Sequence, residues 1–200
     1  MLRNPLILAL TVVALGFLSG CDEAVPIASP STDLDSEMQE VALETDELTE
    51  TVVGLELAAM GVAVEGTEEK TFSRTRSCPG GGEFMAEGRI VRTWDPATGV
   101  MEAEISGSRS RTDCVFPRGD MTITVNGVSE WEKFRRRLNG IPDGLQTSHY
   151  SGSWNAVRSD GEERSCTFDF TVVRDPETHT LTLDGTLCSR GMRRVLNWNG

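Results

Sequence analysis

The chain has 200 residues, of which 38% are hydrophobic, 6% aromatic and 25% charged. These values are typical of a soluble protein with one domain, or one domain and an appendage, and they exclude a polytopic membrane protein, a collagen-like chain and a fully disordered chain. The formal net charge of −12 argues against nucleic acid as a partner, because phosphate binding requires a surplus of basic side chains.

The N-terminus has the pattern of an export signal. Arg3 precedes an apolar run from Leu6 to Phe17, which has the length of a signal-peptide core but is short for a membrane-spanning helix. After this run comes the segment Leu18-Ser19-Gly20-Cys21. It resembles the lipobox of bacterial lipoproteins, in which the cysteine receives the lipid and becomes the new N-terminus.

This resemblance implies a signal peptide over residues 1–20, palmitate or similar acyl chains on Cys21, and a protein anchored in the bacterial cell envelope. Two or three acyl chains hold a protein on a membrane durably. In the lipoprotein family, an aspartate directly after the cysteine often marks retention at the inner membrane. Asp22 stands there and favours that membrane, but the rule varies among lineages, so exposure to the periplasm or to the cell exterior stays open.

Charge divides the mature chain into two parts. Residues 22–69 contain fourteen acidic residues and no basic one, whereas residues 70–200 contain seventeen acidic and eighteen basic residues. Residues 21–32 include two prolines and several small side chains, which predict a tether. This tether is followed by an acidic segment over 33–69 and by a nearly neutral domain over 70–200.

The acidic segment has a helical pattern. Hydrophobic positions alternate at steps of four and three, which predicts a helix over about 33–62. These positions are Leu34, Met38, Val41, Thr45, Leu48, Val52, Leu55, Ala59 and Val62, of which Thr45 is the one that is not hydrophobic. Like charges oppose such a helix when it stands alone. Three interpretations stay open: a marginal helix or disordered stalk, a helix docked on the following domain, or a coiled coil of several copies.

Beyond residue 70, apolar and polar residues alternate in short runs, as in Met121, Ile123 and Val125. Turn signals separate the runs, at 95–99, 126–127, 159–161 and 175–178. The pattern predicts an all-β domain, an antiparallel meander of about eight strands arranged as a barrel or two-layer sandwich.

Residues 129–138 fit either a capped helix or a strand, and the meander favours a strand followed by a loop over 139–144. This segment carries the densest basic cluster of the chain, Lys133, Arg135, Arg136 and Arg137. The cluster is a candidate contact for an anionic surface: lipid head groups, lipopolysaccharide or the protein's own acidic segment. A solvated strand face is the simpler interpretation.

Four cysteines remain after Cys21, and an even number in an exported protein predicts two disulfides. The pairs Cys78–Cys114 and Cys166–Cys188 are each centred on a predicted turn, which favours local pairing. Strand alternation places Cys188 on the wrong face for Cys166, so this second pair requires a bulge. No cysteine spacing is typical of a zinc site.

No catalytic constellation is recognisable. His149 and His179 lack a motif partner, and the loop 78–82 lacks the lysine and following helix of a phosphate loop. We therefore expect an envelope protein that binds or scaffolds, without cofactor, metal or catalysis. Candidate partners are another envelope protein or lipid head groups, but not nucleic acid. The alternative is a small β-barrel that carries an apolar ligand such as a lipid.

Overall fold

Strands occupy most of the chain after a single helix. The computed structural model describes residues 34–197, so the predicted signal peptide, Cys21 and the tether lie outside the described residues. The elements are α1 (Leu34–Ala59), β1 (Gly66–Ser77), β2 (Glu83–Asp95), β3 (Val100–Arg118), β4 (Met121–Leu138), β5 (Ile141–Pro142), β6 (Gln146–Arg158), β7 (Glu163–Asp175), β8 (Thr180–Leu187) and β9 (Arg190–Asn197).

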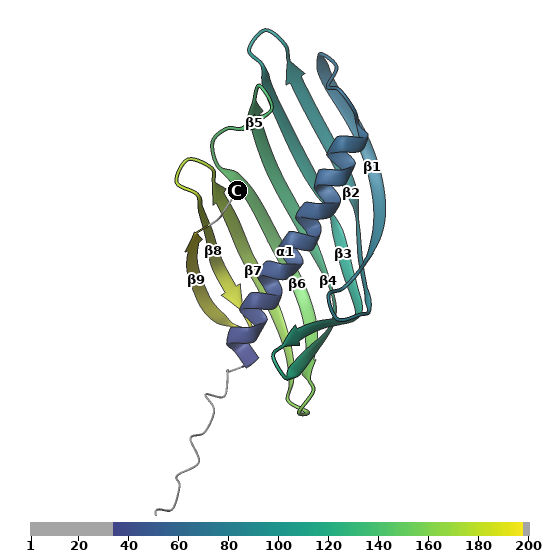
Figure 1. Cartoon of the computed structure of the whole chain (residues 1–200), viewed down its shortest axis with the longest axis vertical. Coiled ribbons are helices and arrows are strands. Elements are labelled where there is room, and N and C mark those ends of the chain that lie inside the picture. The colour runs from purple at the N-terminus through teal and green to yellow at the C-terminus, as the bar shows by residue number, and fades with distance from the viewer. Residues whose placement is uncertain (1–33, 198–200) are drawn as a thin grey trace, which may run out of the picture. The chain divides into compact units, whose positions relative to one another are not determined.

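The strands form one antiparallel meander. Their order in the sheet is β1-β2-β3-β4-β6-β7-β8-β9, and the short β5 pairs with the end of β4. β1 and β9 are the two edges, so the sheet is open, and α1 crosses one of its faces (Figure 1). The predicted antiparallel all-β fold is confirmed, and an open sheet fits the two-layer alternative, with α1 as the second layer.

The face of the sheet that α1 covers is here called the inner face, and the opposite face the outer face. Because neighbouring residues of a strand point to opposite faces, alternating sequences sort their side chains between the two. On β7, for example, Phe168, Phe170 and Val172 are buried while Asp169 is exposed. The buried apolar side chains of the sheet form one cluster with those of α1, so helix and sheet share a single core.

α1 is docked on the sheet, which decides among the three interpretations of the acidic segment. Its buried stripe does not follow the heptad spacing to the end, because Leu55 is 47% exposed and Val62, past the helix, is 91% exposed. An α-helix drifts by about 20° per heptad from a strict seven-residue repeat, and the buried stripe accordingly moves to Thr49, Val53 and Glu56. No helix within residues 34–197 has the length and apolar character needed to cross a membrane.

Residues 129–138 form the second half of β4, which confirms the strand interpretation of this segment. The hairpin expected at Asn126-Gly127 is wrong, because both residues lie inside the same continuous strand. Asn126 instead faces an irregularity of β3 between Arg111 and Cys114. Its side-chain oxygen accepts a hydrogen bond from the Asp113 backbone N–H at 2.7 Å. The Asn126-Gly127 pair, which the sequence assigns to a turn, therefore lies within a strand, and Asn126 hydrogen-bonds to a bulge in the neighbouring strand.

Facing glycines let β2 and β3 approach closely on the inner face. Gly88 is paired with Gly107, and the row continues to Phe72 on one side and Trp131 on the other. The two aromatic rings approach each other with a centroid separation of 6.2 Å. A Cβ atom at Gly107 would lie 2.0 Å from the Glu87 carbonyl oxygen. Glycine is therefore required here by the neighbouring backbone.

Both disulfides join the predicted partners. Cys78, in the loop after β1, is bonded to Cys114, which follows the β3 irregularity. Cys166 of β7 is bonded to Cys188, which lies in the β8–β9 turn. The bulge expected for the second pair is not needed, because Cys188 has a positive φ of 51° and the turn reorients its side chain.

Replacing Gly107 by alanine tests the close approach of the strands. We expect Gly107→Ala to lower the free energy of unfolding by about 2 kcal/mol or more, since the new methyl group overlaps a backbone carbonyl. The matched control is Gly54→Ala on the exposed side of α1, where a Cβ would have no neighbour within 4 Å. This control should stabilise the protein by about 0.5–1 kcal/mol. Urea unfolding followed by circular dichroism measures both, and unchanged stability of Gly107→Ala would contradict the explanation.

Candidate functional site

A layer of buried charges lies between α1 and the inner face of the sheet. α1 contains eight acidic residues and no basic one, while the inner face presents lysines and arginines among its apolar side chains. Three groups of ion pairs join the two elements: a central cluster and one group toward each end of the helix. This charged layer is the most chemically distinctive site in the described part of the chain.

Lys133 of β4 is the centre of the layer. Its ammonium group lies 3.0 Å from Asp46 Oδ1 and 2.7 Å from Glu50 Oε1, both on α1. Nζ also donates to Ser148 Oγ at 3.1 Å and contacts the Tyr150 hydroxyl. The Lys133 side chain is fully buried, so these oxygens replace the water that a surface lysine would have.

Two arginines complete the central cluster. Arg135 pairs with Glu50, and Arg174 of β7 pairs with Asp46 and, at 3.2 Å, with Glu50 Oε1. Tyr150 donates its hydroxyl hydrogen to Asp46. Three cations and two carboxylates thus meet beneath the middle of the helix, which satisfies the requirement that buried charges be paired and hydrogen-bonded.

The carboxyl groups of this cluster are held in their charged form. Burial alone would raise the pKa of Asp46, but Lys133 and Arg174 outweigh it and lower that pKa well below its ordinary value. The pKa of Glu50 is lowered in the same way, since Lys133 and Arg135 oppose the effect of burial. Tyr150 shows the reverse: burial and the neighbouring Asp46 carboxylate raise its pKa well above the ordinary value.

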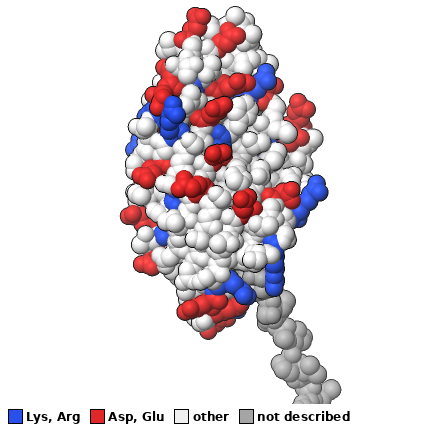
Figure 2. Space-filling model, turned by 180° about the vertical axis from the view of Figure 1, so that it is seen from behind, with Lys and Arg blue, Asp and Glu red and all other residues white. Residues whose placement is uncertain are grey.

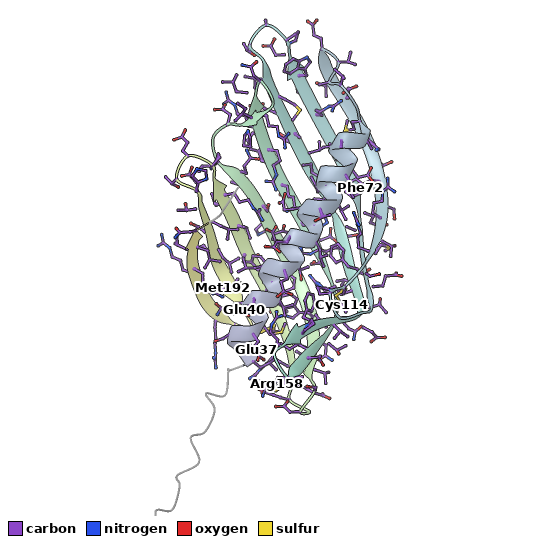
Figure 3. All side chains as sticks on the ribbon, viewed as in Figure 1. Glu37, Glu40, Phe72, Cys114, Arg158 and Met192 are labelled. Carbon is purple, nitrogen blue, oxygen red and sulfur yellow. A yellow bond between two sulfur atoms is a disulfide. The ribbon has the colours of Figure 1, made fainter. Side chains whose placement is uncertain are left out.

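The ends of α1 are also joined to the sheet. At the N-terminal end, Glu37 accepts from Arg158 Nη1 at 3.3 Å, and Figure 3 labels both residues at that end of the helix. Arg118 Nη1 lies 2.9 Å from Glu44 Oε1. At the other end, Glu56 pairs with Lys70 Nζ at 2.8 Å and with Arg74 of β1. The helix is therefore ion-paired along its whole length.

The predicted basic cluster is divided by strand alternation. Lys133 and Arg135 point inward and bind the protein's own acidic segment, one of the three surfaces that the sequence suggested. Arg136 points outward and is 3.0 Å from Asp143 Oδ2, whereas Arg137 has the inward parity of Lys133 and Arg135 but is exposed near the end of β4. The four residues do not form one surface.

Sequence reasoning missed the contributions of Arg158 and Arg174. A signal for both was present: each has the same parity as the apolar residues of its strand, Ala156 for Arg158 and Val172 for Arg174. A basic residue at an inward position of an amphipathic strand indicates a buried partner of opposite charge. The acidic helix was the available partner.

The outer face differs in chemistry. Figure 2 shows acidic and basic groups interspersed among uncharged side chains on this face. A hollow of about 900 Å³ lies over β3, β4, β6 and β7, and alternation places small polar side chains in it, including Ser110, Thr112, Asn126, Ser153 and Asn155. His149, whose Nε2 is 3.0 Å from Asp169 Oδ1, borders a second hollow of about 480 Å³.

Comparison of the chain with models of protein families, with curated proteins and with solved structures gives no match. Over residues 34–197, no three His, Cys, Asp or Glu side chains are grouped so that they could hold a metal ion.

Removing Lys133 tests the charged layer. We expect Lys133→Met to lower the free energy of unfolding by about 3 kcal/mol, because the substitution removes the fully buried cation that contacts both Asp46 and Glu50 and leaves these carboxylates with arginine ion-pair partners only. Arg89→Met is the matched control, since Arg89 forms a solvent-exposed pair with Glu69 and should change the stability little. Equal effects in urea unfolding would contradict a central role for Lys133.

The lowered pKa values predict acid sensitivity. Asp46 and Glu50 have lower pKa values in the folded state than in the unfolded state, so their contribution is complete above a pH of about 4–5 and is lost as the pH falls through the folded pKa values. We expect the urea midpoint to decrease steadily below about pH 4. Asp46→Asn should be less stable at pH 7 and show a flatter acid decline; an equally steep decline would contradict the assignment.

Proposed function

We propose that this chain is a lipid-anchored protein of the bacterial cell envelope whose disulfide-linked β domain works by binding or scaffolding and not by catalysis. The observation that carries the second half of the proposal is the closure of the inner face by α1. The acidic side chains in the layer, including Asp46 and Glu50, accept from basic side chains of the sheet, so these carboxylates are engaged in holding the helix.

Two features support the envelope location. The segment Leu18-Ser19-Gly20-Cys21 resembles a lipobox, and the two disulfides of the β domain are typical of proteins outside the reducing cytoplasm. Asp22 favours retention at the inner membrane. Membrane attachment through Cys21 would place the β domain at the end of a tether, where it meets other envelope components.

The outer face is the proposed binding surface. The ion-paired helix covers the inner face, whereas the outer face offers the hollow of about 900 Å³, whose lining includes Arg164 and Arg190 as well as hydroxyl and amide side chains. Such groups donate and accept hydrogen bonds without the cost of removing a full charge from water. A polar partner of the envelope, another protein or lipid head groups, suits this chemistry.

The alternative of an apolar-ligand carrier receives less support. A carrier of the predicted kind requires a closed barrel with an apolar interior. Here the sheet is open, and charged side chains such as Lys133 and Arg174 stand beneath α1. An apolar ligand in that position would have to displace the helix and leave these charges unpaired.

Substituting Cys21 tests the anchor. We expect Cys21→Ser to abolish incorporation of labelled palmitate and to shift the protein from the membrane fraction to the soluble fraction, because the thiol that accepts the lipid is lost. Cys78→Ser serves as a control, since its thiol takes part in a disulfide and should leave acylation intact. Acylation of the Cys21→Ser chain would contradict the lipoprotein assignment.

The released Cys21→Ser protein also distinguishes binding from transport. Native mass spectrometry should show no stoichiometric apolar ligand, because α1 and its ion pairs cover the inner face. Lipid that co-purifies in stoichiometric amount would favour the carrier instead. Turnover of an envelope substrate by the purified protein would contradict the non-catalytic role.

A further inference from the structure

β3 brings two arginines together inside the charged layer. Arg109 and Arg111 are two residues apart on one strand and therefore share the inner face. Their residues are only 1% and 2% exposed. Arg109 is among the largest fully buried side chains of the described chain, and it is charged.

Arg109 has only neutral hydrogen-bond acceptors. Its Nε donates to Ser129 Oγ at 2.8 Å, and its Nη1 donates to Thr49 Oγ1 at 2.9 Å and to the Thr45 carbonyl oxygen at 3.4 Å. Its Nη2 is buried and has no acceptor within the described chain. The guanidinium carbon lies 4.0 Å from the centroid of the Tyr150 ring.

Arg111 has even fewer hydrogen-bond acceptors than Arg109. Its Nε, Nη1 and Nη2 are all buried, and no residue over 34–197 accepts a hydrogen bond from any of them. Its guanidinium lies over the Trp154 ring, 5.0 Å from the centroid. A cation–π contact offsets only part of the free energy that burial of an unpaired ion costs.

The other buried cations of the layer show the contrast. Lys133, Arg135, Arg158 and Arg174 each pair with at least one carboxylate, whereas neither Arg109 nor Arg111 pairs with a carboxylate of the described side chains. Arginine keeps its charge in proteins, so the two guanidinium groups add two positive charges to this part of the core. Their mutual repulsion increases the cost of burial.

We propose that Arg109 and Arg111 form a binding site for a phosphate-type oxyanion beneath α1. A dianionic tetrahedral group neutralises both guanidinium groups, whereas a single carboxylate would neutralise one. Guanidinium groups donate pairs of N–H bonds in a geometry that matches phosphate oxygens. The free nitrogen atoms, Arg109 Nη2 and the three of Arg111, are the donors available to it.

The site is independent of the proposed function, because it rests on the interior of the described chain and not on lipidation. Its position nevertheless links anion binding to the helix. Thr45 and Thr49 of α1 accept from Arg109, so an anion that neutralises the arginines favours the docked helix. Anything that binds only the folded state raises its stability by mass action.

The test is the thermal unfolding midpoint of the full mature protein in detergent, at constant pH and ionic strength, with chloride, sulfate or inorganic phosphate. We expect a saturable increase with phosphate and sulfate that chloride does not produce. In a separate arm, short-chain phosphatidic acid replaces inorganic phosphate. A response to the lipid alone assigns the phosphate group to a lipid head group, and a response to inorganic phosphate assigns it to the free ion.

Substitutions at Arg111 test whether a shift of the unfolding midpoint with phosphate depends on this site. Arg111→Met should abolish the increase and, in chloride, give a midpoint equal to or above that of the unsubstituted protein, because an uncompensated charge is removed. Arg111→Lys keeps a charge but loses the planar donor geometry, so half-saturation should require about tenfold more phosphate or higher. Arg89→Met, at an exposed outer position, should respond like the unsubstituted protein.

Two results would overturn the site. One is a midpoint that responds to phosphate, sulfate and the phosphatidic acid no more than to chloride. The other is a full phosphate response in both Arg111→Lys and Arg111→Met. If Arg111→Met does not fold, the Arg111→Lys titration decides the question by itself.

Discussion

The ion-paired layer between α1 and the inner face is the interaction on which the remaining structure depends. α1 has no basic residue to relieve its own negative charge, so an isolated helix is opposed by repulsion. The inner face has the complementary problem, because Lys133 and Arg174 would be poorly hydrated within an apolar surface. Docking resolves both problems at once, since Lys133 and Arg174 pair with carboxylates of α1 and the apolar stripe of α1 is buried.

Two local features shape the sheet on which α1 docks. The close approach of β2 and β3 at Gly88 and Gly107 and the irregularity of β3 before Cys114 both alter a regular pleated surface. Glycines and bulges are the usual means by which strands bend. The disulfide at Cys114 fixes the strand directly after this irregularity to the loop that follows β1. Backbone geometry and covalent links thus support the face that receives the helix.

The same arrangement separates the two faces by chemistry. The inner face uses strong charges, which are worth most where water is excluded and which require a partner. The outer face uses hydroxyl, amide and scattered charged groups that water satisfies (Figure 2). Arg109 and Arg111 are the exception to the pairing rule on the inner face, and this exception, together with the polar hollow on the outer face, is where recognition of other molecules is best sought.

Local chemistry in the sequence determined much of this protein. Asp95 and Asp175 begin their predicted turns by accepting backbone N–H bonds, and the spacing around these turns anticipated both disulfides. The tertiary structure alone decided that the acidic segment is a docked helix and that Asn126-Gly127 lies within a strand beside a bulge. It also decided that Lys133 and Arg135 are buried against α1 while Arg136 and Arg137 are exposed. Turns depend on neighbours in the chain, whereas the partner of a buried charge lies more than eighty residues away, as for Lys133 and Asp46. Only folding brings these two together.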